Sequence, residues 1–140
     1  MSRQLYNDAI IALAKANHGA GRLPQPEVSA TCDNPLCGDR VTIDLVTTGG
    51  AVRDLAQRTR GCLLTQAAAS AIGRHGAGVT PEQVREVTAQ LRRLLAGEAV
   101  ETAWPELAMF APVSAVKSRH DCVLLPFQAL AEALDQVPRR

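Results

Sequence analysis

In the first part of the chain, the apolar positions first follow a helical period and then lose all periodicity. Leu5, Ile10 and Leu13 recur at helical spacing, and further alanine and isoleucine residues widen this apolar face. The pattern predicts a helix over residues 3–17 that ends where a glycine-containing stretch begins. Residues 18–28 contain two glycines followed by two prolines, so we expect a loop there.

From Ser29 onwards the apolar positions repeat every second residue. Val41, Ile43 and Leu45 alternate with other side chains, as in a strand with one buried face. The sequence TTGG at 47–50 predicts a hairpin turn, because paired glycines suit turn positions with positive φ. The expected strands are residues 28–33, 41–46 and 51–60.

Helical patterns return after the strands. CLLTQAAASAIGRHG at 62–76 is rich in alanine, lacks proline and ends in glycine, which indicates a helix. TPEQ at 80–83 is a capping box with proline in the first turn, so a second helix should begin there and run to about Ala96.

The last part of the chain is less regular. Residues 98–118 show only short helical pieces, and a final helix is expected over 122–136, with Asp121 as its cap and Pro126 near its start. The order of helix, antiparallel strands and helices predicts an α+β fold, with a small antiparallel sheet of about three strands and helices packed on one face. We expect a single domain over residues 1–140.

Composition and charge narrow the classes of function. The chain is 46% hydrophobic and 21% charged, as expected of a folded domain. An aromatic content of 3% argues against a surface that stacks nucleic-acid bases, and a net charge of +1 gives no attraction to nucleic acid or membranes. No signal peptide and no run of roughly 18 apolar residues is present. We therefore expect a cytoplasmic protein, in a compartment where thiols stay reduced.

Three of the four cysteines fall where the expected structure changes. Cys37 lies in a loop between strands, Cys62 at a strand-to-helix junction and Cys122 at a loop-to-helix junction. A helix N-terminus stabilises negative charge, so thiols there can become nucleophiles or metal ligands. Spacing alone leaves two interpretations open. In the first, the cysteines form a shared thiolate site. In the second, they pack as small hydrophobic residues, which stays open because the chain has no C-x-x-C pair that would signal a zinc ribbon.

Three sequence blocks carry these cysteines: NPLCGDRV at 34–41, GCLLTQAAAS at 61–70 and RHDCVLL at 119–125. In this order and context they resemble the iron–sulfur cluster assembly scaffold family of the IscU, SufU and NifU N-terminal type. The resemblance extends over roughly residues 5–135. The long segment at about 77–104 resembles the SufU-like branch.

The resemblance implies roles for four residues. Cys37, Cys62 and Cys122 match the three family cysteines, and Asp39 matches the aspartate of C-G-D. In that family these groups surround a transient [2Fe–2S] cluster or a zinc ion. Sulfur comes from a cysteine desulfurase as a persulfide, for which Cys122 and Cys62 are the candidate acceptors. The implied recipients are apo-proteins or carrier proteins, and we expect a monomer or weak dimer.

The residue types agree with such a site. Thiolates suit both iron and zinc, whereas a carboxylate is a harder ligand and should leave an iron–sulfur cluster more easily. Gly38 would let the loop bend so that Cys37 and Asp39 converge. Asp39 has an alternative interpretation as an ordinary turn residue, which we consider the weaker one.

Other residues near the site depart from the family pattern. The IscU branch has histidine directly before its third cysteine, where this chain has Asp121, and His120 lies one residue earlier. His120 is a candidate ligand, a hydrogen-bonding neighbour of a ligand or a surface residue. Cys32 is an additional cysteine that we interpret as packed in a strand, although its position would allow a disulfide or persulfide transfer.

The leading hypothesis is a cytoplasmic scaffold, not an enzyme, that accepts sulfur and holds a transient [2Fe–2S] cluster for apo-proteins. The alternative is a zinc-containing sulfurtransferase that activates a cysteine desulfurase without storing a cluster. The third hypothesis is a structural domain with inert thiols.

Overall fold

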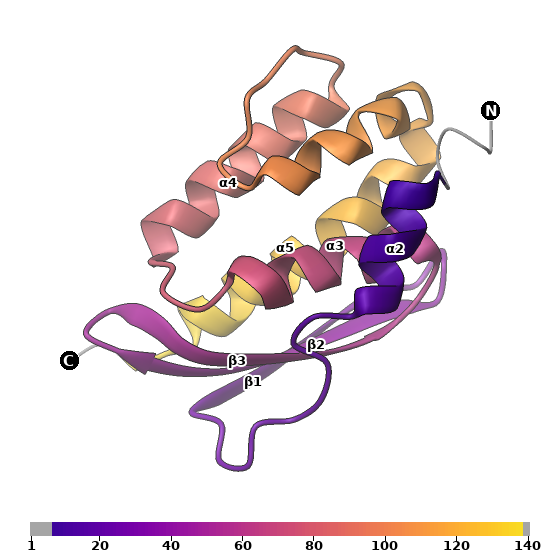
Figure 1. The fold of residues 1–140 in the computed structure, drawn as a ribbon. Coiled ribbons are helices and arrows are strands. Elements are labelled where there is room, and N and C mark those ends of the chain that lie inside the picture. Colours follow the sequence, from indigo (N-terminus) through magenta and orange to yellow (C-terminus); the bar gives the residue numbers. More distant parts are fainter. Residues whose placement is uncertain (1–6, 139–140) are drawn as a thin grey trace.

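The computed structural model describes residues 7–138, which form an antiparallel sheet covered on one face by helices (Figure 1). Val41, Ile43 and Leu45 are fully buried beneath those helices, as their alternation predicts. The predicted α+β fold is therefore confirmed. The strands lie in the order β1-β2-β3, with β1 at Val28–Asn34, β2 at Asp39–Thr48 and β3 at Ala51–Arg60.

β2 begins two residues before its expected start. Asn34 still pairs with Asp39 in the antiparallel register of β1 and β2. Asp39 is therefore the first residue of a strand and shares the buried face with Val41. At the far end of β2, Gly49 and Gly50 have φ angles of 62° and 82° and close the predicted hairpin turn to β3.

The first described helix, α2, spans Asp8–Ala16 and is capped at both ends. The side chain of Asn7 accepts a hydrogen bond from the backbone N–H of Ile10 at 3.0 Å. Asn17 ends the helix in the left-handed conformation, with φ at 45°. The expected helix is confirmed over these residues, and its expected first turn at residues 3–6 lies outside the described residues.

The two middle helices follow the sequence pattern closely. α3 spans Leu63–His75 and α4 spans Pro81–Leu95. The predicted capping box is present, since Thr80 Oγ1 accepts from the backbone N–H of Gln83 and Gln83 Oε1 accepts from that of Thr80.

The start of the last helix differs from the prediction. Two 3₁₀ segments, η1 at Pro105–Ala115 and η2 at Lys117–Arg119, lead directly into α5 at His120–Asp135. Because Arg119 at the junction already has helical backbone angles, no extended residue is available for a side-chain cap. The prediction that Asp121 caps this helix is therefore wrong, and Asp121 lies in its first turn.

The helices form two layers above the sheet (Figure 1). α3 and α5 pack directly on the strands, whereas α4 and η1 pack on α5 and on each other, farther from the sheet. Within the part of the chain that the structure describes, no helix is long and apolar enough to cross a membrane.

Candidate metal centre

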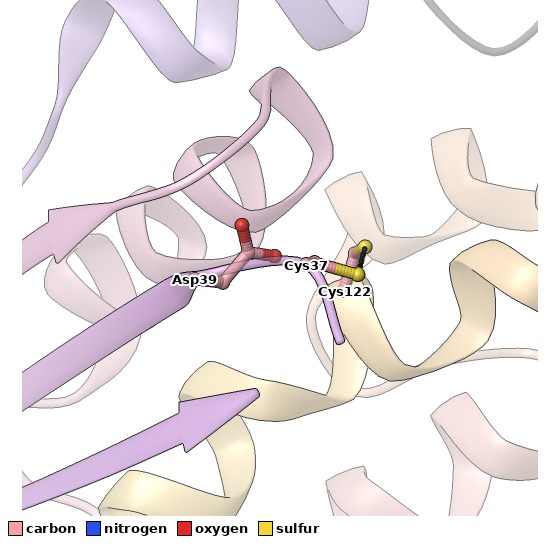
Figure 2. Close-up of side chains that lie close together, drawn as sticks. All are labelled: Cys37, Asp39 and Cys122. Carbon is pink, nitrogen blue, oxygen red and sulfur yellow. Dashed lines mark hydrogen bonds between the residues drawn. The ribbon is translucent and has the colours of Figure 1, made fainter. Parts of the chain in front are cut away.

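Three potential metal ligands meet at one end of the sheet. Cys37 comes from the loop between β1 and β2, Asp39 from the first position of β2, and Cys122 from the first turn of α5. Their ligand atoms all lie within 4.8 Å of one another. The sulfur atoms of Cys37 and Cys122 face each other (Figure 2). The distance between them is 4.0 Å.

The Cys37 loop is held by Asn34. The backbone carbonyl of Asn34 accepts hydrogen bonds from the N–H groups of Cys37 at 3.2 Å and Gly38 at 2.8 Å. Its side-chain amide also lies 3.5 Å from the Cys37 sulfur. Gly38 has φ at +72°, a conformation that favours glycine, and this bend brings Cys37 and Asp39 to the same side.

Asp39 is a buried carboxylate whose orientation is fixed by Thr65. Only 4% of Asp39 is exposed, and its Oδ2 accepts a hydrogen bond from Thr65 Oγ1 at 2.9 Å. A Cβ atom at position 61 would lie 2.8 Å from Asp39 Oδ1, so only glycine at Gly61 leaves the space that this carboxylate occupies. One oxygen of this carboxylate lies within 4.8 Å of the sulfur atoms of both Cys37 and Cys122.

Cys62 lies at the edge of the group. It is the residue that precedes the first turn of α3, and its sulfur is 3.5 Å from Thr65 Oγ1. It is not among the three residues whose ligand atoms lie within 4.8 Å of one another. It is nevertheless close enough to Cys122 for its charge to affect that thiol. Thr65 therefore connects Cys62 to Asp39.

Cys122 is the most enclosed thiol of the site. It is completely buried, whereas Cys62 is half-buried and Cys37 is exposed. The pKa of Cys122 is raised to about 12, first by burial and then by the charge of Cys62, while a hydrogen bond from Arg119 acts in the opposite direction. A bound cation would favour its thiolate form, so metal binding here is expected to release a proton.

Three residues near the motifs lie outside the cluster. His120 points its Nε2 at the backbone carbonyls of Val113 and Ser114, at 3.0 and 3.3 Å, and thereby ties α5 to η1. Asp121 is exposed. Cys32 is half-buried in β1 against the hydrophobic core, in agreement with the packing interpretation.

Sequence reasoning missed Thr65 and Gly61. Thr65 is fully buried, although a threonine in a helix usually lies toward its surface. A signal was available, since residue 65 is three positions after Cys62 and therefore shares its face of the helix. The role of Gly61 depends on the position of the Asp39 side chain, which no local pattern reports.

The donor set fits a thiophilic metal. With metal–sulfur bonds of about 2.3 Å, an ideal tetrahedron places two sulfur atoms about 3.8 Å apart. The observed 4.0 Å between Cys37 and Cys122 is close to that value. A carboxylate oxygen completes a third position, and Cys62 is the nearest remaining thiol.

Comparison with known proteins gives two matches in sequence. The family model described as the NifU-like N terminal domain matches residues 5–139. The iron–sulfur cluster assembly scaffold protein IscU of Thermotoga maritima is 25% identical over 138 residues, which is 98% of this chain and 97% of that protein.

Solved structures of similar proteins share the fold of this chain. A nitrogen-fixing NifU-like protein (N-terminal) from Brucella abortus has a TM-score of 0.91 at 33% identity, over 97% of this chain and 96% of its own. A protein from Fervidobacterium islandicum AW-1, described as an iron–sulfur cluster assembly scaffold for the SUF system, shares the fold with a TM-score of 0.85. Its identity is 23%, over 96% of this chain and 99% of its own. The match of the family model to nearly all of the sequence shows that this chain belongs to the NifU-like N-terminal domain family.

Proposed function

We propose that the chain is an iron–sulfur cluster assembly scaffold, which accepts sulfur from a cysteine desulfurase and holds a transient [2Fe–2S] cluster for apo-proteins. The observation that carries this proposal is the convergence of Cys37, Asp39 and Cys122 within 4.8 Å, with Cys62 beside them. The IscU relative named above is a scaffold for cluster assembly, which supports the same function here.

The cluster is the cargo of such a protein, so the site must both hold and release it. Cys37, Cys62 and Cys122 would supply thiolate ligands, which bind iron firmly. Asp39 would supply the one hard ligand, which is matched less well to an iron–sulfur cluster. We expect release to begin with the bond to this carboxylate.

The thiols differ in how readily another protein can reach them. Cys37 is exposed and Cys62 is half-buried, whereas Cys122 is buried with a pKa raised by burial to about 12. Burial and a raised pKa both reduce the nucleophilicity of a thiol. Of the two candidate persulfide acceptors, Cys62 is therefore favoured by exposure over Cys122.

Anaerobic reconstitution with iron and sulfide tests the proposal. The protein should acquire a visible chromophore that Cys37→Ser, Cys62→Ser and Cys122→Ser each weaken. Cys32→Ser is the matched control and should leave the chromophore unchanged, because Cys32 lies outside the cluster. A wild-type protein that forms no chromophore contradicts the proposal.

Asp39→Ala tests how the cluster is released. Without the carboxylate the cluster should persist longer than in the wild type, in the presence of an apo-protein acceptor or a chelator. The decay of the visible absorbance measures its lifetime. Faster decay in the variant contradicts the assignment of Asp39 as the labile ligand.

A second candidate is a zinc-containing sulfur acceptor that activates a cysteine desulfurase without storing a cluster. It is favoured by the small span of the three ligand atoms, which is that of a single tetrahedral ion. Metal analysis of the purified protein, combined with desulfurase turnover in its presence, separates the two candidates. Stoichiometric zinc with strong stimulation and no cluster formation would select this second one.

A further inference from the structure

The mouth of the metal centre carries an exposed apolar side chain. Leu36 is 92% exposed, and it is the one large hydrophobic residue with an exposed side chain among residues 7–138. It directly precedes Cys37, the exposed thiol of the site. Single exposed leucines are common on protein surfaces, so the position of Leu36 needs further support before it can be assigned a role.

The backbone of Leu36 is held by the same turn at Asn34 that positions Cys37. Its backbone N–H donates to Asn34 Oδ1 at 3.1 Å, while the next two N–H groups donate to the Asn34 carbonyl. The turn therefore directs Cys37 toward Cys122 and leaves Leu36 facing solvent. A backbone fixed in this way loses little freedom when a partner covers the side chain that it carries, which favours this position as a binding anchor.

A cationic patch lies at the same end of the sheet. Arg40 and Arg60 are directly opposite each other in the register of β2 and β3, and both are exposed. Like charges at directly opposite positions of neighbouring strands destabilise a sheet. Asp33 neutralises Arg40, with an ion pair at 2.6 Å. No ion pair among residues 7–138 involves Arg60.

The surface of this cationic patch contains a depression. Arg40, Arg58 and Arg60 line a shallow depression of about 250 Å³ with two threonines. Arg58 is held by Asp44 at 2.9 Å, so Arg60 is the guanidinium in this depression that remains available to an external carboxylate. Arg60 is two residues before Cys62, as Leu36 is one residue before Cys37. Leu36 in the loop before β2 and Arg60 at the end of β3 therefore both lie at the end of the sheet that carries the thiols.

We propose that Leu36 and Arg60 form the docking surface for the sulfur-donor protein, which offers an apolar pocket to Leu36 and a carboxylate to Arg60. This inference rests on the proposed function. A thiolate of the site attacks the outer sulfur of the donor's persulfide. A new S–S bond then forms as the donor's S–S bond breaks, and the donor cysteine leaves as a thiolate. This displacement needs the two sulfur atoms aligned in contact, so the donor has to be held at the end of the sheet where Cys62, the favoured acceptor, lies beside the site.

Sulfur transfer from the cysteine desulfurase of the same organism tests this surface at low ionic strength. Leu36→Asp should raise the KM for this protein about tenfold or more, because an apolar anchor is lost and a charge is introduced. Leu36→Met should retain nearly normal transfer, since it keeps an apolar side chain of similar size. Arg60→Glu should raise KM about three- to tenfold, and added salt should reduce this difference.

Three controls separate docking from folding and from metal binding. Arg92→Glu reverses an exposed charge on α4 and should leave KM unchanged. All variants should still form the chromophore from iron and sulfide and reach the wild-type kcat at saturation. Transfer of a preloaded cluster to an apo-protein should remain normal.

The outcomes that overturn the inference are distinct. A KM within twofold of wild type for both Leu36→Asp and Arg60→Glu removes the docking surface but leaves the proposed function intact. Normal sulfur uptake with slowed cluster transfer would assign the surface to a recipient instead. A wild-type protein that neither accepts sulfur nor forms a cluster overturns the proposed function itself.

Discussion

Thr65 is the residue that connects the two halves of the candidate metal centre. Its hydroxyl donates to the buried carboxylate of Asp39 and lies 3.5 Å from the sulfur of Cys62. A carboxylate that ligates a metal is oriented by the hydrogen bonds to its other oxygen, and the loss of such a bond weakens metal binding.

Thr65→Val removes this hydroxyl at almost constant volume. The apo-protein should lose about 1–3 kcal/mol of unfolding free energy, because a buried carboxylate oxygen loses its donor. Zinc affinity should fall about tenfold or more. Urea unfolding and competition with a chelator measure the two effects. Thr88→Val is the matched control, since the Thr88 hydroxyl bonds only to the Val84 carbonyl of its own helix. Equal losses in the two variants would contradict the special role of Thr65.

At the scale of elements, α3 is pressed against the segment that follows α2. A Cβ atom on Gly73 would lie 1.9 Å from the carbonyl oxygen of His18, so the two backbones are in contact. Ser70 accepts a hydrogen bond from the His18 N–H, and Gln57 of β3 donates to the His18 carbonyl. This contact fixes α3 relative to the sheet, and with it the position of Cys62.

Gly73→Ala should therefore destabilise the protein by about 3 kcal/mol or more, as in other overpacked sites. In an exposed helix the same change stabilises by up to about 1 kcal/mol, so the sign of the effect is diagnostic. Thermal or urea unfolding measures it. An unchanged or higher stability would contradict the close packing.

η1 is fastened to the end of α3 by Glu106. The carboxylate of Glu106 is 2.5 Å from His75 Nε2 and 3.5 Å from a nitrogen of Arg74, and the His75 ring stacks on Trp104. Burial alone would raise the pKa of Glu106, but a backbone N–H, His75 and Arg74 outweigh it and hold this pKa below its usual value.

A carboxylate with a lowered pKa in the folded state stabilises the fold above its ordinary pKa, which is 4.5 for Glu106, and this contribution disappears as the pH falls through the lowered value. Glu106→Gln should therefore be less stable than wild type at pH 7, and the difference should shrink toward pH 3. Urea midpoints across this range test it. Glu86→Gln, at an exposed position of α4, should show no such trend.

At the scale of the whole molecule, a bound metal would join parts of the chain that are far apart in sequence. Cys37 and Cys122 are 85 residues apart and come from a sheet loop and the last helix. A ligand that binds only the folded state stabilises it by about 4 kcal/mol at a thousand times its dissociation constant.

Saturating zinc should accordingly raise the melting temperature by roughly 10 °C, given about 2–4 °C per kcal/mol for a chain of this size. Cys37→Ser and Cys122→Ser should each lose most of this shift, and a chelator should reverse it in the wild type. Cys32→Ser should keep it. A shift that survives in Cys122→Ser would place the metal elsewhere.

Much of the fold follows from local patterns. Alternation predicted the buried face of β2, and the capping box predicted the start of α4. The start of α5 did not follow, because it depends on the preceding 3₁₀ turn at Lys117–Arg119 and not on a capping side chain. Asp121 satisfied the composition rule for a cap without having the backbone conformation that capping requires.

The candidate site also combines features that the sequence predicts with features that depend on tertiary packing. Cysteines at element boundaries and a family resemblance pointed to the four proposed ligands, and the structure gathers Cys37, Asp39 and Cys122. The hydrogen bond from Thr65 and the space left by Gly61 depend on how α3 docks against β2. Such contacts between distant elements have no signature in a single sequence.

The 4.0 Å separation between the sulfur atoms of Cys37 and Cys122 also has a consequence for the protein in air. A shift of about 2 Å would bring them to the length of a covalent S–S bond. Because Cys37 is exposed, an oxidant can reach the pair, and the resulting crosslink would consume two ligands at once. The metal-free protein is therefore the oxygen-sensitive form, and purification without a reductant should yield molecules that can no longer be loaded.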